Sequence, residues 1–201
     1  MTSPLLTRIG AGCGTLFAVV LFVASGSGNE SFDTPRAVAG LAALALFIPF
    51  LAYLCSLLRA AEGEKGWLAT TALVAGIVGI TIKIVSVVPA LALHHAHIAD
   101  GTRLHKMFDA FDNGATVIAL YPFAVACAAI AVVALRTAAL PRWLAVAAAF
   151  TAVALAVNGV FLEASFVPAL LLFIGWIFVA SVSLLRVTPR TAGRVRTAAE
   201  H

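Results

Sequence analysis

The stretch WLATTALVAGIVGITIKIVSVVPALAL, residues 67–93, decides the fold class, because Lys83 is its one charged side chain. A helix needs about 20 mostly apolar residues to cross the hydrocarbon core of a bilayer. The backbone must also satisfy its own hydrogen bonds in lipid, and a run this long and continuously apolar is not a barrel strand. The sequence therefore predicts an all-α polytopic bundle of six transmembrane helices. The other five spans lie near 7–25, 37–58, 113–135, 142–162 and 167–185.

The composition of the chain agrees with this prediction. Of 201 residues, 62% are hydrophobic and 11% are charged, whereas a soluble domain is about a quarter charged. So few charges cannot cover a water-facing surface, which excludes a soluble domain and a disordered chain. The net charge of +4 does not indicate nucleic-acid binding, because the charges lie between the apolar stretches and mark the membrane faces. The expected partner is the lipid bilayer.

The Lys and Arg residues between the spans set the orientation, because cytoplasmic loops carry an excess of them. One side holds nine and the other holds three, so both termini are expected in the cytoplasm. We expect one membrane domain over 1–186 and a flexible basic cytoplasmic tail over 187–201, in the inner (cell) membrane. The nine are Arg8, Arg59, Lys65, Arg136, Arg142, Arg186, Arg190, Arg194 and Arg196, and the three are Arg36, Arg103 and Lys106.

The first span has an alternative interpretation as a signal peptide. Arg8 precedes an apolar run that ends in Val-Ala-Ser at 23–25, which is typical of a cleavage site. We prefer a retained helix, because Gly10 and Gly14 form a small-residue face of the kind that packs membrane helices.

Lys83 is the most informative residue, because it lies deep in an apolar stretch. It follows Trp67 by 16 residues, about 24 Å along a helix, and so falls in the outer half of the membrane. A lysine near the centre of a membrane helix costs roughly 2.5–3.5 kcal/mol on insertion scales. We expect it to face the bundle and an acidic partner, with extension to the outer interface as the alternative. Small residues share its helix face: Gly76, Gly79, Ser86 and Ala90.

The acidic start of the span 113–135 offers the partner. Asp112 lies at the depth of Lys83 and is the preferred partner, and Asp109 is the reserve. Asn113 and Thr116 follow within a turn of Asp112. Opposite charges so placed form either a buried ion pair or one wall of a polar pocket.

Two further polar residues end the span 142–162. Asn158 and Glu163 are about 140° apart around a helix, so they cannot both face one point. Glu163 is instead expected at the start of the next helix, where a negative charge is favourable. The predicted site consists of Lys83, Asp112, Asp109, Asn113, Asn158 and Glu163.

Histidines gather around the outer connection at 94–112. Imidazole and carboxylate together bind zinc, copper or nickel, and His105 and Asp109 share a helix face. The spacing matches no established metal motif, so a histidine-rich polar loop is the preferred interpretation. These histidines crowd one rim and do not face one another in mid-span, so haem is not predicted, and neither is any other cofactor. The metal candidates are His94, His95, His97 and His105.

Other patterns leave alternatives open. Residues 49–69 and 122–145 share Pro-Phe, Cys, Leu-Arg and Trp-Leu-Ala in that order, which indicates either a duplicated hairpin or the preference for Arg at cytoplasmic helix ends. Prolines inside the spans either bend the helices or open a cavity among them. No phosphate loop or Gly-x-Ser-x-Gly elbow is present, so an enzyme is left open but is not favoured. The prolines are Pro49, Pro89 and Pro122.

Several segments resemble a known family. IKIVS at 82–86, DAFDN at 109–113, YPF at 121–123 and LPRWL at 140–144 are similar to a bacterial, mainly actinobacterial, family of six-helix integral membrane proteins described only as a domain of unknown function. The resemblance extends over most of the chain and is best over 80–145. It implies the six-helix fold and an inner-membrane location, and it implies no activity.

Three classes of function follow from these predictions. The preferred one is a protein that binds or transports a small molecule or ion through a polar pocket around Lys83. The first alternative is an accessory or interaction protein whose polar residues only fix helix packing. The second is a metal-binding protein that uses the outer histidines.

Overall fold

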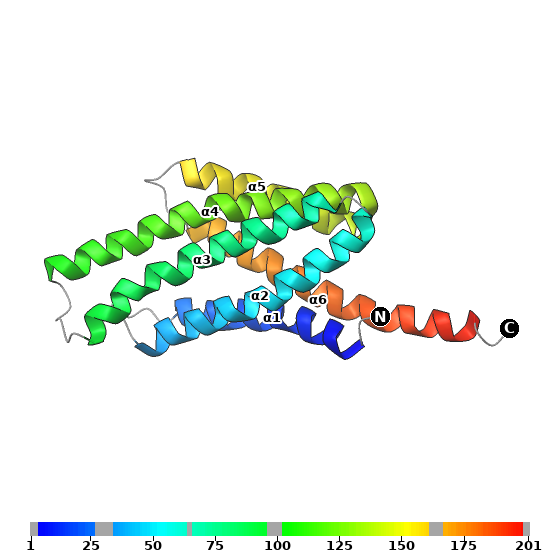
Figure 1. Ribbon diagram of the computed structural model, residues 1–201, viewed down its shortest axis with the longest axis horizontal. Helices are drawn as coiled ribbons and strands as arrows, with labels where there is room; N and C mark the ends of the chain where they lie inside the picture. Colours follow the sequence, from blue (N-terminus) through cyan, green and yellow to red (C-terminus); the bar gives the residue numbers. More distant parts are fainter. Residues whose placement is uncertain (1–3, 27–33, 64–65, 96–101, 161–166, 199–201) are drawn as a thin grey trace.

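A computed structural model describes residues 4–26, 34–63, 66–95, 102–160 and 167–198, and within these ranges it is helical apart from short connections (Figure 1). No strand occurs in these ranges, so the predicted all-α fold is confirmed there. The helices are α1 (Pro4–Gly26), α2 (Thr34–Glu62), α3 (Trp67–His95), α4 (Arg103–Thr137), α5 (Arg142–Val160) and α6 (Val167–Ala198).

Five of the helices, α2 to α6, are long and apolar enough to cross a membrane. In α1 the apolar part that the structure describes, Arg8–Val23, is shorter than a span. The fold is therefore that of a multi-pass helical membrane protein, and a sixth span through α1 stays a prediction.

α4 begins about ten residues earlier than the apolar pattern predicts. The side chain of Thr102 accepts a hydrogen bond from the backbone N–H of His105 at 3.2 Å and so caps the first turn. The connection predicted over 94–112 is therefore partly helical. Polar residues end an apolar stretch but do not end a helix, which explains the difference. At 35 residues α4 is about 52 Å long, well beyond the ~30 Å hydrocarbon core.

α6 also continues past its apolar part. The tail predicted from Val187 falls within α6, which the structure describes as far as Ala198. In Figure 1 this part of α6 leaves the bundle and carries the C-terminus away from it.

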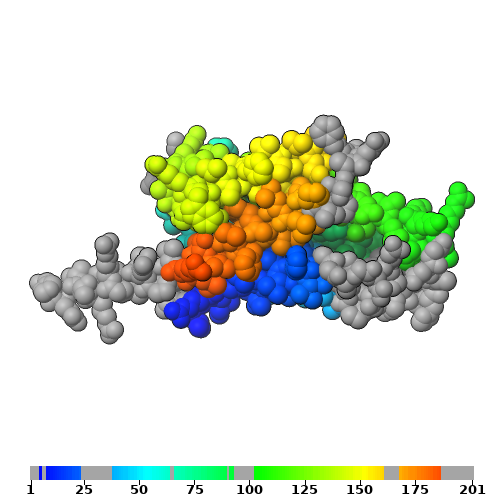
Figure 2. Space-filling model, turned by 180° about the vertical axis from the view of Figure 1, so that it is seen from behind, coloured from blue at the N-terminus to red at the C-terminus, as the bar shows by residue number. Residues whose placement is uncertain are grey.

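The helices form a closed ring in which each packs on the next in sequence and α6 returns to α1. α2 also contacts α4 across the ring. Figure 2 shows the closing contacts, with α6 lying between α5 and α1. The C-terminal part of α3 and the N-terminal part of α4 extend together past the other helices at one end (Figure 1). We call this end the α3–α4 end.

The other end carries exposed arginines, and we call it the arginine-rich end. It contains the start of α1, α3 and α5 and the ends of α2 and α4, where α6 also leaves the bundle (Figure 1). Both exposed tryptophans, Trp67 and Trp143, lie in the first turn of a helix at this end, as expected of anchors at a membrane interface. The described arginines of this end are Arg8, Arg59, Arg136, Arg142 and Arg186.

An aromatic cluster fills the centre of the ring. Phe47 of α2 lies 5.0 Å from Phe17 of α1, 6.2 Å from Phe123 of α4 and 6.0 Å from Phe173 of α6, measured between ring centroids. The rings of Phe123 and Phe173 are 4.9 Å apart. One cluster therefore joins four of the six helices.

The small-residue face of α3 packs against protein. A Cβ atom on Gly79 would lie 2.7 Å from the ring of Phe123, and one on Gly76 would lie still closer to the side chain of Leu51 of α2. Ser86 on the same face is buried. Because these residues turn toward the bundle, Lys83 on that side also turns toward α4.

α1 packs tightly on its neighbours through its own glycines. A Cβ atom on Gly10 would lie 2.7 Å from the Cβ of Tyr53, and one on Gly14 would meet Phe50 and Ser181. The hydroxyl of Ser181 on α6 donates to the carbonyl oxygen of Ala11. α1 is thus an integral part of the described bundle.

The prolines of the predicted spans and the cysteines lie inside the helices. Pro49, Pro89 and Pro122 each sit within a helix that continues past them. The cysteines are all free, and Cys55 and Cys127 are buried, in agreement with a packing role.

Candidate functional site: an ion pair between α3 and α4

The structure brings Lys83 of α3 and Asp112 of α4 together. The Nζ atom of Lys83 lies 2.8 Å from Oδ1 of Asp112, a distance that makes a charge-assisted hydrogen bond. The side chain of Lys83 is 21% exposed and that of Asp112 is 41% exposed. The pair therefore lies at the edge of the helix interface and not at its centre.

Thr116 binds both partners. Its hydroxyl accepts a second hydrogen bond from the Lys83 Nζ at 2.8 Å and donates to the backbone carbonyl of Asp112 at 2.8 Å. Because Thr116 follows Asp112 by one helical turn and is buried, α4 presents a carboxylate and a hydroxyl to the same ammonium group.

Ser86 completes the site from α3. It follows Lys83 by three residues, and its Oγ lies 2.5 Å from Asp112 Oδ1 and 2.8 Å from the Lys83 carbonyl oxygen. The hydroxyl has one proton, so it can donate to only one of these acceptors at a time. In the sequence Ser86 is distinguished only as a small residue on the face of Lys83, although a hydroxyl one turn from a membrane lysine is a signal for a partner of its counter-ion.

The pair leaves hydrogen-bonding capacity unused. Lys83 donates two of its three ammonium protons, to Asp112 and Thr116. Oδ1 of Asp112 lies within reach of Lys83 and Ser86, whereas Oδ2 has no hydrogen-bond partner among the residues that the structure describes. Asp112 is also the more exposed partner. The arrangement can hold an ion pair and still offer an open carboxylate oxygen to a cation or hydrogen-bond donor.

The other acidic and amide candidates on α4 lie apart from this pair. Asp109 is exposed and lies 3.6 Å from the Nε2 of His105, one turn earlier on the same helix. It is therefore directed along α4 and not at Lys83. Asn113 is exposed next to Asp112.

Asn158 lies at another level of the bundle. It is half-buried near the end of α5. A Cβ atom on its neighbour Gly159 would lie 3.0 Å from the ring of Tyr121, which follows Asp112 by nine residues. That spacing is about 13 Å along α4, so the structure does not bring Asn158 to the ion pair. Glu163 lies outside the described residues.

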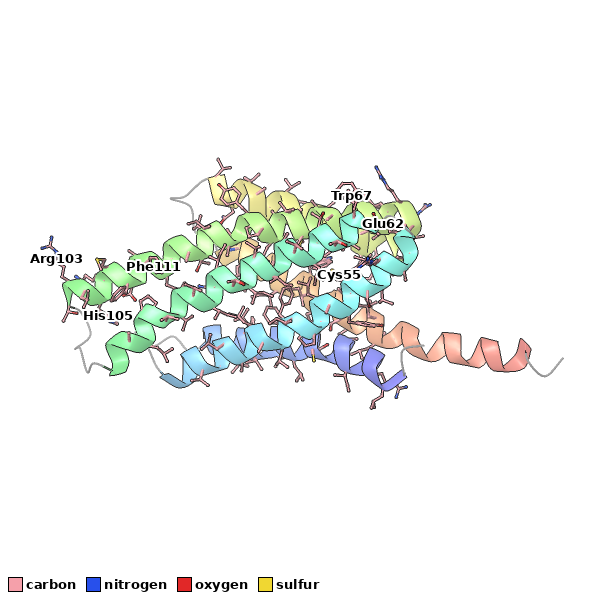
Figure 3. All side chains as sticks on the ribbon, viewed as in Figure 1. Cys55, Glu62, Trp67, Arg103, His105 and Phe111 are labelled. Carbon is pink, nitrogen blue, oxygen red and sulfur yellow. The ribbon has the colours of Figure 1, made fainter. Side chains whose placement is uncertain are left out.

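Of the four histidines predicted as metal candidates, only His105 has a side chain that the structure describes. Its imidazole pairs with Asp109, and Figure 3 shows it with Arg103 and Phe111 at the α3–α4 end. The side chains of His94 and His95 and all of His97 lie outside the described part of the chain. Among the side chains that are described, no three metal-ligating groups come together.

Glu62 is a structural residue that the sequence analysis missed. Its carboxylate accepts hydrogen bonds from the backbone N–H groups of Leu68 and Ala69, at 3.2 and 3.0 Å, and so caps the start of α3. Figure 3 shows Glu62 beside Trp67, at the end of the bundle opposite His105. A capping acid placed five residues before the first helical residue has no fixed spacing that would identify it in a sequence.

The site and the fold together define a class: a multi-pass helical membrane protein with an ion pair between two of its helices. No protein-family model, curated protein or solved structure matches the chain.

Proposed function

We propose that this protein binds and transports a small polar molecule or ion at the Lys83–Asp112 pair. The observation that carries the proposal is the open side of the site: Asp112 is 41% exposed and its Oδ2 has no hydrogen-bond partner among the described residues. Ionisable side chains within membrane helices commonly mark substrate or ion pathways.

The charge of the site limits the ligand. Lys83 and Asp112 neutralise each other, so the site does not attract either sign of charge strongly by itself. A ligand with a cationic or donor group competes with Lys83 for the carboxylate, and one with an acceptor group uses the third ammonium proton. Amines, amino acids and small cations fit the open carboxylate oxygen best.

The membrane arrangement is part of the proposal. Six spans with both termini in the cytoplasm would place the arginine-rich end inside and the pair in the outer half of an inner-membrane protein. The excess of exposed arginines at that end supports this orientation. Membership of the actinobacterial six-helix family belongs to the same proposal and is supported by the segments around the pair.

Ligand-dependent melting of the purified protein tests the binding proposal. A ligand at about 100 times its Kd stabilises a protein by about 2.7 kcal/mol, which a melting curve resolves. We would screen amines, amino acids, carboxylates and metal cations against wild type, Asp112→Asn and the control Asp109→Asn. A ligand that stabilises wild type and Asp109→Asn but not Asp112→Asn supports the site. Stabilisation that persists in Asp112→Asn places binding elsewhere.

The second candidate function is structural, with the pair serving to hold α3 against α4 in an accessory membrane protein. Ser86 and Thr116 favour it, because these buried hydroxyls already bond the two charged groups. The double variant Lys83→Met with Asp112→Asn separates the candidates. If the role is structural, the double variant should regain both the stability and the cellular function that the single variants lose. If the pair is a ligand site, the double variant should regain the stability alone.

A further inference from the structure

We propose that the arginine-rich end of the bundle binds anionic phospholipid headgroups, with Arg136 and Arg142 as its centre. These two residues flank the connection between α4 and α5, and the surface also includes Arg8, Arg59 and Arg186. This end lies opposite the ion pair, so the inference is independent of the proposed function.

The charge of this end is not balanced by the protein. All five arginines are exposed, and none forms an ion pair with another residue in the described ranges. Glu62 is the described acid at this end, and its carboxylate is occupied by the backbone N–H groups at the start of α3. The guanidinium groups are therefore available to an anion from outside the described chain.

The connection between the two central arginines has a defined geometry. The backbone N–H of Ala138, which has a φ of 54°, donates to the carbonyl of Ala134 at 3.0 Å. The N–H of Ala139 donates to the hydroxyl of Thr137, and Leu140 is buried. Arg136 and Arg142 are thus held on either side of a short, hydrogen-bonded turn, which reduces the entropy lost when both bind one partner.

Helix stability does not account for both central arginines. Arg136 is in the last turn of α4, where a cation interacts favourably with the helix dipole. Arg142 is in the first turn of α5, where a cation is unfavourable and no acidic residue compensates it. A partner with negative charge would compensate this arginine.

Trp143 and Trp67 identify that partner as a lipid. Trp143 directly follows Arg142 and is 56% exposed, and Trp67 at the same end is 60% exposed. Exposed tryptophans of membrane proteins lie at the headgroup level. A planar guanidinium group binds a phosphate group through two parallel hydrogen bonds. Arginines at this level therefore meet the phosphates of the bilayer, and several unpaired arginines favour a headgroup with net negative charge.

Binding of phosphatidylglycerol to the purified full-length protein tests the proposal. The measurement is the apparent affinity for fluorescent phosphatidylglycerol diluted in phosphatidylcholine nanodiscs, read by energy transfer from the protein's tryptophans. Each arginine near a membrane surface is worth about 1 kcal/mol, or roughly fivefold in affinity. Arg136→Gln with Arg142→Gln should then weaken binding roughly 25-fold. The melting temperature of each variant shows that it is folded.

Two controls make the result specific. Arg103→Gln with Lys106→Gln removes the same number of charges from the opposite end and should leave the affinity unchanged. Arg136→Lys with Arg142→Lys keeps the charge and should retain most of the binding. Equal affinity of the double glutamine variant and wild type would overturn the proposal, as would equal losses in both glutamine pairs. Displacement of the lipid by inorganic phosphate would instead identify a site for free phosphate and would also overturn it.

Discussion

Ser86 shows how a charged pair at a membrane helix interface depends on an uncharged neighbour. Its buried hydroxyl lies 2.5 Å from the carboxylate oxygen that Lys83 also binds. The ammonium group of Lys83 and the hydroxyl of Ser86 thus lie within hydrogen-bond distance of the same carboxylate oxygen. The depth of Lys83 and Asp112 can be read from the apolar pattern, whereas the role of Ser86 depends on which face of α3 meets α4. For that reason the sequence predicts the pair but not its hydroxyl partner.

Ser86→Ala should destabilise the protein without disturbing its packing. The substitution removes a donor to a charged acceptor, and hydrogen bonds of this kind contribute roughly 1.5–3 kcal/mol. We expect a loss at the lower end of that range, because Asp112 is partly exposed and keeps Lys83. Unfolding by denaturant in mild detergent measures the loss. An Ala variant as stable as wild type would show that the serine donates to the Lys83 carbonyl instead.

At the scale of the elements, close approach of α3 and α4 places the pair. Gly79 allows the ring of Phe123 to lie against α3, and Lys83 follows one turn later, opposite Asp112 and Thr116. The lengths of the apolar stretches predict six helices. They do not predict the start of α4, because the segment from Arg103 to Asp112 is interrupted by charged residues and is helical all the same. Depth also placed Asn158 in the predicted site, whereas its neighbour Gly159 packs on Tyr121, about 13 Å along α4 from Asp112.

Gly79→Ala should loosen the contact between α3 and α4. The new Cβ would lie 2.7 Å from the ring of Phe123, which is fixed in the aromatic cluster. Overpacking of this kind costs roughly 1–3 kcal/mol. Gly114→Ala on α4 is the matched control, because a Cβ there meets nothing within 4 Å and alanine favours the helix. We expect Gly79→Ala to melt at a lower temperature than wild type and Gly114→Ala to melt at the same or a higher temperature. The reverse order of the two variants would contradict this packing.

Glu62→Ala should weaken the start of α3. Loss of a helix-capping side chain costs roughly 0.5–2 kcal/mol, and here two backbone N–H groups lose their acceptor. Glu62→Gln keeps one oxygen acceptor and should lie between Ala and wild type. Hydrogen exchange of the amides of Leu68 and Ala69 measures the effect locally. Unchanged protection in the Ala variant would show that water replaces the cap without cost.

At the scale of the whole molecule, the two ends differ in their chemistry. The arginine-rich end holds exposed guanidinium groups without a described acidic partner, whereas the α3–α4 end carries acids, a histidine and two cations on one helix. Composition and loop charges predict this polarity well, since it depends only on which residues follow each span. The way the ring closes, with α6 against α1, depends on contacts such as that of Ser181 with Ala11 and has no counterpart in the linear pattern.

Labelling of single cysteines in intact cells tests the proposed orientation. Lys106→Cys is exposed at the α3–α4 end and should react with a membrane-impermeant maleimide added outside. Ala139→Cys, exposed in the α4–α5 connection, should react only after the cells are permeabilised. Both variants carry the native cysteines, of which Cys55 and Cys127 are buried, and wild type gives the background. Labelling of Ala139→Cys in intact cells would show that the topology is the reverse of the proposed one.

The central claim is that Lys83 and Asp112 stabilise the protein as one interacting pair. A double-mutant cycle tests this claim most directly. The measurement is the free energy of unfolding in detergent for Lys83→Met, Asp112→Asn and both together. Breaking a buried pair costs roughly 3–5 kcal/mol, and the exposure of Asp112 places our expectation at or below the lower figure. The double variant should recover much of the loss of Lys83→Met, because both charges leave together. If the loss of unfolding free energy in the double variant equals the sum of the losses in the two single variants, the two residues do not act as a pair.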